Sequence, residues 1–184
     1  MLQLWYQEPA SYWEEALPLG NGRLGAMVWS GVQQETLSLN EDSLWSGYPK
    51  CADVPGADEY YRQARELVRQ KKYAEAQSLI EEKILSDFTQ SYLPLADLRV
   101  EMDQPKGEVT NYRRSLCLED AISRLTYTIG DVTYTREAFV SAPDQVIVLR
   151  ISANKPGSVS LKASFNCRLR SCTTIKKSRL ILDG

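Results

Sequence analysis

The chain has 184 residues, of which 43% are apolar and 25% are charged, with 22 basic and 24 acidic side chains. These proportions are typical of globular proteins and exclude disordered and collagen-like chains. No run approaches the roughly 18–20 apolar residues of a membrane span, so we expect a soluble protein without a membrane partner. The sequence contains no histidine. Ser/His/Asp and Cys/His catalytic groups, and every metal site that uses histidine, are therefore excluded.

Two short strands are predicted near the N-terminus. Residues 24–29 have apolar side chains at both the odd and the even positions, so both faces of a strand here would be apolar. This pattern indicates a strand that is covered on both faces. The dipeptide Asn21-Gly22 just before it accepts positive φ in a tight turn. Residues 35–39 alternate with period two and are expected to form the partner strand.

Between residues 57 and 86 the apolar period changes from two to 3.6. This pattern predicts two amphipathic helices packed as a hairpin, with a polar break at Gln70-Lys71-Lys72. From residue 95 onward period two returns. A hairpin is predicted across Gly130-Asp131, and further strands over 145–152, 159–165 and 179–182.

Short strands joined by short turns predict a mainly β fold, an antiparallel β-sandwich with an inserted two-helix hairpin at 57–86. The last strand is followed by Asp183-Gly184, which resembles the turn of an unfinished hairpin. We therefore expect a sandwich that is incomplete at its C-terminus and a chain that is a fragment of a longer protein.

The cysteines and the N-terminus bear on the compartment. Cys51, Cys117, Cys167 and Cys172 show no zinc spacing, and free thiols in a reducing compartment are favoured. A small disulfide loop between Cys167 and Cys172 remains the alternative. No basic leader with a long apolar run follows Met1. The protein is therefore expected to be cytoplasmic, or secreted or periplasmic if a signal peptide has been removed.

Two further patterns suggest a cofactor and a nucleic-acid partner. Gly20-x-Gly22-x-x-Gly25 matches a dinucleotide fingerprint, but it precedes a strand instead of following one and opening a helix, so no cofactor is expected. Residues 145–182 contain eight basic and no acidic side chains. Because exposed aromatic residues are not interleaved there, a solvated sheet face or docking onto an acidic neighbouring domain is favoured over nucleic-acid binding.

Residues 40–47, Asn-Glu-Asp-Ser-Leu-Trp-Ser-Gly, form the candidate site. Amide, carboxylate and indole groups together are typical of sugar binding, and Asn40, Glu41 and Trp45 are the proposed substrate-binding residues. The alternative is an ordinary loop whose Trp45 fills the core. The doublets Glu14-Glu15 and Glu41-Asp42 point to opposite faces of an extended chain, so neither can flank one glycosidic bond. No catalytic residue and no metal ligand is therefore assigned.

Five ordered motifs resemble the N-terminal domain of glycoside hydrolase family 95, the α-L-fucosidases. They are Leu-Pro-Leu-Gly-Asn-Gly-Arg-Leu-Gly-Ala-Met-Val-Trp from residue 17, Leu-Asn-Glu-Asp-Ser-Leu-Trp-Ser-Gly from 39, Ser-Tyr-Leu-Pro-Leu-Ala-Asp-Leu from 91, Tyr-Arg-Arg-Ser-Leu-Cys-Leu-Glu-Asp-Ala from 112, and Tyr-Thr-Arg-Glu-Ala-Phe-Val-Ser from 134. Ala96 and Cys117 depart from the glycine and aspartate expected there.

The resemblance implies a β-sandwich over residues 1–184, followed in the full enzyme by an (α/α)6 barrel that this chain lacks. It implies hydrolysis of terminal fucose on glycans with inversion, by residues of that barrel. The expected partners are a fucosylated glycan, bound by the full-length enzyme, and the chain's own barrel. A stand-alone carbohydrate-binding module and a fragment of an α-L-galactosidase of the same family remain alternatives. The 184-residue chain alone is expected to be inactive.

Overall fold

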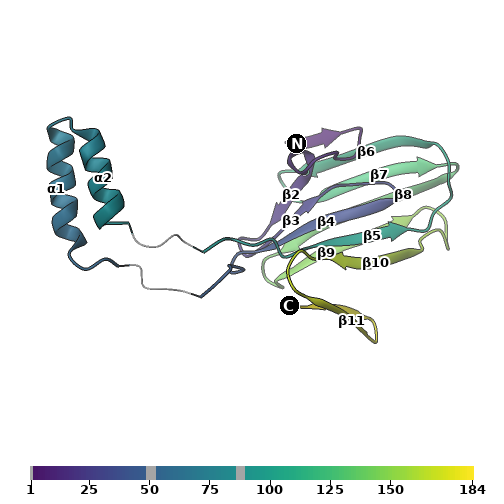
Figure 1. Ribbon diagram of the computed structural model, residues 1–184. Helices are drawn as coiled ribbons and strands as arrows, with labels where there is room; N and C mark the ends of the chain where they lie inside the picture. Colours follow the sequence, from purple (N-terminus) through teal and green to yellow (C-terminus); the bar gives the residue numbers. More distant parts are fainter. Residues whose placement is uncertain (1, 49–52, 86–89) are drawn as a thin grey trace. The chain divides into compact units, whose positions relative to one another are not determined.

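A computed structural model of the protein describes residues 2–48, 53–85 and 90–184 (Figure 1). The chain divides into two compact units. The sandwich unit comprises Met1–Leu44 and Leu93–Gly184, and the helical unit comprises Trp45–Tyr92. In the part of the chain that the structure describes, no helix is long and apolar enough to cross a membrane.

Two five-stranded antiparallel sheets form the sandwich unit, as the sequence predicted. The first sheet contains, in spatial order, β1 (Gln3–Tyr6), β6 (Val109–Cys117), β7 (Ser123–Ile129), β8 (Val132–Ser141) and β9 (Val146–Ala153). The second sheet contains β10 (Leu161–Asn166), β5 (Ala96–Met102), β4 (Gln34–Glu41), β3 (Leu24–Val28) and β2 (Leu17–Gly20). A short 3-10 turn, η1 (Trp13–Glu15), lies between β1 and β2.

The predicted hairpin turns have the geometry that their glycines allow. Ile129 pairs with Val132, so Gly130 and Asp131 are the two central residues of the β7–β8 turn. Gly130 has a φ of 60°, whereas Asp131 is not among the residues with positive φ, which fits a type II′ turn. In the β2–β3 turn, Gly22 has a φ of 93°, a value that glycine adopts without steric cost.

The core lies between the sheets, where the inward side chains of both meet. Strands β2, β3 and β4 contribute alternate apolar residues, and β6 and β8 contribute from the opposite sheet. The fully buried members are Leu17, Leu19, Ala26, Val28, Leu37, Leu116 and Ala138. Burial of apolar surface at about 25 cal/mol per Å² makes this contact the main source of the sandwich's stability.

The expectation that residues 24–29 are covered on both faces is wrong. Ala26 and Val28 are buried in the core, but Met27 and Trp29 on the outer face are only half-buried among the described residues. Apolar side chains on both faces of a strand do not by themselves show that a second layer covers the sheet. Here the outer face instead carries part of a cleft, described below.

A buried ion pair connects the two sheets. Arg136 of β8 and Glu35 of β4 are 2% and 1% exposed, and Nη1 lies 3.2 Å from Oε2. The Arg136 guanidinium also donates to the carbonyls of Gly31 and Val32. Burial raises the pKa of the Glu35 carboxyl above its usual range, while the charge of Arg136 and the N–H of Ser30 oppose that shift.

A second buried arginine fixes the N-terminal segment to the sandwich. Arg114 of β6 is 2% exposed, and it donates to the carbonyl oxygens of Glu8 at 2.7 Å and Glu15 at 2.6 Å. Its guanidinium also lies 4.1 Å from the centre of the Tyr6 ring. Charge-assisted hydrogen bonds of this kind hold the backbone from residue 8 to residue 15, and hence η1, in one position.

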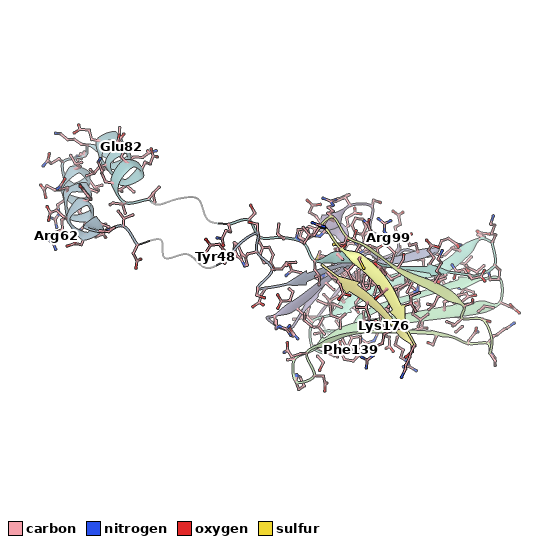
Figure 2. All side chains as sticks on the ribbon, turned by 60° about the horizontal axis from the view of Figure 1, so that its bottom comes forward. Tyr48, Arg62, Glu82, Arg99, Phe139 and Lys176 are labelled. Atoms are coloured by element: carbon pink, nitrogen blue, oxygen red, sulfur yellow. The ribbon has the colours of Figure 1, made fainter. Side chains whose placement is uncertain are left out.

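The helical unit contains the predicted hairpin, α1 (Ala57–Arg69) and α2 (Tyr73–Lys83). The break falls where the sequence placed it, and Lys71 there has a φ of 62°. Ala64 and Ala76 are the buried residues of the two helices, while charged side chains such as Arg62 and Glu82 cover their outer surfaces (Figure 2). The predicted helical range ends at 86, a residue outside those described; α2 itself ends at Lys83.

At the C-terminus, β11 (Cys172–Lys176) and β12 (Arg179–Asp183) form a separate two-stranded hairpin. Figure 1 shows this hairpin projecting beside β10. Cys117, Cys167 and Cys172 are free thiols, so the small disulfide loop between the last two is absent, as favoured from the sequence; Cys51 lies outside the described residues.

Candidate functional site

Two of the three predicted site residues lie at the C-terminal end of β4. Asn40 and Glu41 are the last two residues of that strand and are still paired with β3. Asn40 is opposite Gly25, and Glu41 is opposite Leu24. The Gly-Asn-Gly-Arg-Leu-Gly and Asn-Glu-Asp motifs, which are about 20 residues apart in the sequence, are therefore side by side in the second sheet.

The β2–β3 turn next to Glu41 is held in shape by Asn21. Its Oδ1 accepts hydrogen bonds from the N–H groups of Arg23 at 3.0 Å and Leu24 at 2.7 Å, which is the local bonding that favours asparagine in turns. Its Nδ2 donates to the carbonyl of Ser141 at 2.9 Å. Because Ser141 ends β8, this contact joins the two sheets at one end of the sandwich.

Arg23 completes that end of the sandwich. Its Nε donates to Oε1 of Glu41 at 3.0 Å, and its Nη1 donates to the side-chain oxygen of Gln145 at 3.3 Å. The two motifs and the β8–β9 turn therefore meet in one polar cluster, which we call the end cluster: Asn21, Arg23, Glu41, Ser43, Ser141 and Gln145.

The Glu41 carboxylate is engaged on both oxygens. Oε1 faces Arg23, while Oε2 accepts from the N–H of Ser43 at 2.9 Å and from its hydroxyl at 2.6 Å. These hydrogen bonds from Ser43, with the guanidinium of Arg23, lower the pKa of Glu41. Glu41 is therefore ionised at neutral pH, and it can accept hydrogen bonds from sugar hydroxyls but cannot supply a proton to a leaving group.

Asn40 sits on the outer face of the second sheet, and Gly25 leaves space beside it. A Cβ added to Gly25 would lie 3.5 Å from the Asn40 Cβ and 3.7 Å from its Nδ2. The amide is half-buried and belongs to the same outward set as Ser38, two residues earlier on β4. An amide on this face offers two donors and an acceptor to a ligand hydroxyl.

Trp45 belongs to the helical unit, not to the unit that holds Asn40 and Glu41. It is 46% exposed and therefore is not the buried core side chain of the alternative interpretation. It pairs with Tyr92 as an isolated antiparallel bridge, and the two rings are 5.2 Å apart in an edge-to-face arrangement. The predicted segment 40–47 is thus divided between two units, with the boundary after Leu44.

Sequence reasoning did not single out Arg23 and Ser43 as partners of Glu41, nor Asn21 as the residue that holds the neighbouring turn. The signal was available, because antiparallel pairing of the strands at 24–29 and 35–39 places the Asn21-Gly22 turn opposite residue 41. Among the described residues, Glu35 is the carboxyl with a raised pKa, and it is buried beside Arg136. In the same ranges, no group of three acidic or cysteine side chains is arranged to hold a metal ion.

The fold and the end cluster define an antiparallel β-sandwich domain with polar motifs gathered at one end. A family model described as "Glycosyl hydrolase family 65, N-terminal domain" matches residues 4–184. The chain belongs to this family of glycosidase N-terminal domains.

The curated relatives are described as α-fucosidases. "Alpha-L-fucosidase 2" of Arabidopsis thaliana is 40% identical over 187 residues, which cover 100% of this chain and 22% of the relative. "Probable alpha-fucosidase A" of Aspergillus niger is 35% identical over 82% of this chain and 20% of its own length, and that of Aspergillus oryzae is 32% identical over 82% and 21%. The chain therefore spans about a fifth of the length of these relatives.

Proposed function

We propose that this chain is the N-terminal β-sandwich domain of an α-L-fucosidase of glycoside hydrolase family 95. In this proposal, the full-length enzyme removes terminal fucose from glycans with inversion, and the catalytic (α/α)6 barrel lies outside the 184 residues. The observation that carries the proposal is the 40% identity to an α-L-fucosidase along the whole chain, joined to the family match over residues 4–184.

The chemistry of the described side chains supports a non-catalytic role for this domain. An inverting glycosidase needs a carboxyl group that stays protonated near neutral pH and a second carboxylate across the bond, roughly 6.5–9.5 Å away. Glu35 has a raised pKa but is buried in the core, and Glu41 has a lowered pKa. Neither can act as an accessible general acid.

Asn40, Glu41 and Trp45 are proposed to contribute to the sugar pocket of the full-length enzyme. The end cluster supports this role for Glu41, because Arg23 and Ser43 hold the Glu41 carboxylate ionised and fixed. The half-buried amide of Asn40 on the outer face supports it for Asn40. A carboxylate held in this way can orient a substrate hydroxyl without losing further rotamer entropy. The exposed indole of Trp45 offers an apolar surface for a sugar ring.

The proposal is tested by expressing the complete open reading frame and the 184-residue chain in parallel. Each is assayed for release of fucose from an aryl α-L-fucoside, with the corresponding α-L-galactoside as the specificity control. The complete protein is expected to cleave the fucoside and to release the β-anomer first, as inversion requires. Faster cleavage of the galactoside would assign the galactosidase specificity instead. Failure of the complete protein on both substrates would overturn the proposal.

A further inference from the structure

A second polar and aromatic feature lies on the outer face of the second sheet, within the sandwich unit. It is a cleft of about 360 Å³, inside the range of roughly 300–1,000 Å³ that small-molecule sites occupy. Its walls bring together side chains from five separate segments of the chain. The lining residues are Trp13, Trp29, Ser38, Pro94, Leu95, Ala96, Asp97, Asn166 and Arg168. We call this feature the Trp13 cleft.

The strand register explains how polar groups come to line the Trp13 cleft. Ser38 of β4 pairs with Asp97 of β5, and Asp97 pairs in turn with Asn166 of β10. These three residues therefore form one row across three adjacent strands, on the face opposite the core. Nδ2 of Asn166 is 3.4 Å from Oδ2 of Asp97, which is a weak contact that a ligand hydroxyl can replace.

Two tryptophans supply the apolar part of the Trp13 cleft. Trp29 follows β3, and its indole N–H donates to the Ser38 hydroxyl at 3.1 Å. Trp13 begins η1 and is 55% exposed. The exposed ring of Trp13 and the indole of Trp29 give the cleft an aromatic lining.

Hydrogen bonds to the backbone on both sides of Trp13 fix the position of this residue. Arg114 is buried and holds the carbonyl of Glu15, the last residue of η1, at 2.6 Å. The N–H of Ala10 also donates to the carbonyl of Trp29 at 3.1 Å. The segment that carries Trp13 is thus tied to β3 and β6, so the cleft requires little ordering when a ligand binds.

Arg168 adds a positive charge to the same cleft. It is exposed, and among the described residues its guanidinium has no carboxylate within ion-pair distance. A guanidinium, a carboxylate and a primary amide in one cleft offer both donors and acceptors to neighbouring hydroxyl groups. An indole face beside them accepts the C–H face of a pyranose ring. This combination fits a neutral sugar better than an apolar ligand or a phosphate.

We propose that the Trp13 cleft is a carbohydrate subsite that binds a pyranose unit of the glycan substrate, separate from the end cluster. The inference rests on the proposed function for the identity of the glycan. The row formed by Ser38, Asp97 and Asn166 holds the hydroxyl groups of the sugar, and Trp13 packs against its ring. Asn40 lies on the same outer face, two residues beyond Ser38, so a glycan chain can extend from this cleft toward the end cluster.

The test is a binding titration of the 184-residue chain with 2′-fucosyllactose, lactose and L-fucose, followed by NMR. The chain has four tryptophans, so four indole N–H signals are expected. Addition of the fucosylated oligosaccharide is expected to shift the signals of Trp13 and Trp29 and to leave that of Trp5 in place. Trp13→Ala is expected to weaken binding by about tenfold or more, as truncation of a central aromatic anchor does.

Trp5→Ala is the matched control. Trp5 is also an exposed tryptophan, 50% against 55% for Trp13, but it lies on β1 of the first sheet and packs 4.9 Å from the Arg113 guanidinium. Its truncation is expected to leave the affinity unchanged. Asp97→Asn, which keeps the shape of the side chain, is expected to weaken binding without lowering the melting temperature.

Three outcomes would overturn the subsite: no binding at tens of millimolar sugar, shifts confined to Trp5 or Trp45, or equal affinity of Trp13→Ala and the wild type. The proposed function fails separately. If the complete protein cleaves aryl fucosides but Trp13 does not respond to sugar, the function stands and the subsite falls. If the chain binds the oligosaccharide through Trp13 but the complete protein cleaves no fucoside, the subsite stands and the proposed function falls.

Discussion

Replacement of Arg136 by methionine tests whether the buried ion pair between the sheets is essential for folding. The guanidinium of Arg136 binds the Glu35 carboxylate, the Tyr127 hydroxyl and the carbonyls of Gly31 and Val32. Methionine keeps most of the apolar stem but removes every one of these donors. The change leaves a carboxylate and two carbonyl groups buried without the cation that satisfied them.

The expected loss follows from burial. Breaking a fully buried ion pair by removing one partner typically costs about 3–5 kcal/mol, because the other charge stays desolvated. For a domain of this size, such a loss lowers Tm by about 10 °C. Loss of Arg136 also raises the pKa of Glu35 further, so the folded variant takes up a proton that the unfolded chain releases. The deficit of the variant is therefore expected to be larger at about pH 8 than at about pH 5.

Arg150→Met is the matched control. Arg150 and Glu137 also form an arginine–glutamate pair with an N–O distance of 3.2 Å, but the Arg150 side chain is 72% exposed. An exposed pair contributes about 0–1 kcal/mol. Urea unfolding of both variants and the wild type gives the free energies directly. Equal losses in the two variants would show that burial does not set the contribution of the Arg136–Glu35 pair. Strict additivity of Arg136→Met and Glu35→Gln in the double variant would show the same, since paired groups must couple.

Three further predictions concern Asn40, an exposed acid and the thiols. In the complete enzyme, Asn40→Ala is expected to lower kcat/KM while Tm stays unchanged, and the fall should correspond to a loss of about 1–3 kcal/mol in transition-state binding. A fall in Tm with normal kinetics would contradict a binding role. The hydrogen bonds of Arg124 and of the Ile122 N–H hold the pKa of Asp120 at about 2. The stability that this ionised carboxylate contributes is present above about pH 4 and lost as the pH falls toward 2, so the urea midpoint of the wild type should approach that of Asp120→Asn over this interval. Cys172 is exposed and Cys117 is buried, so Cys172→Ser, but not Cys117→Ser, is expected to remove a fast phase of thiol titration.

The strands that alternate cleanly between core and solvent could be predicted from the sequence. Strand β7 alternates buried and half-buried residues without interruption from Ser123 to Ile129, and β8 continues the pattern from Tyr134 to Ala138. Period two is a local property, so no tertiary information is needed to find such strands. The helical hairpin was predictable for the same reason, because period 3.6 returns after the polar break.

Strands β1, β2, β6 and β11 were not predicted, and for β1 and β6 the structure gives the physical reason. All four residues of β1 are exposed, so an edge strand of this kind shows no alternation. In β6 the register shifts between Thr110 and Arg113, and Asn111 has a φ of 53°; such a bulge interrupts period two. Arg114 and Arg136 occupy positions in their strands that alternate in step with buried apolar residues. This pattern indicates that the two arginines are buried, but only the packed structure identifies their partners.

The candidate site could be predicted only in part. The polar segment from residue 40 was visible in the sequence because amide, carboxylate and indole groups are adjacent there. The division of that segment between two units and the engagement of Glu41 by Arg23 depend on tertiary structure. The Trp13 cleft could not be predicted from the sequence, because its residues come from segments up to about 150 positions apart. Strand register aligns Ser38, Asp97 and Asn166, and the hydrogen bonds of Arg114 and Ala10 place the segment that carries Trp13.

We propose that the 184 residues form a non-catalytic N-terminal domain of an α-L-fucosidase. The most direct test is the release of fucose from an aryl α-L-fucoside by the complete gene product and by the purified 184-residue chain at equal molar concentration. We predict turnover by the complete protein and none by the chain, because Glu35, the described carboxyl whose pKa is raised, is buried beside Arg136 and cannot reach a leaving group. Fucose release by the repurified chain, or none by the complete protein, would contradict the account.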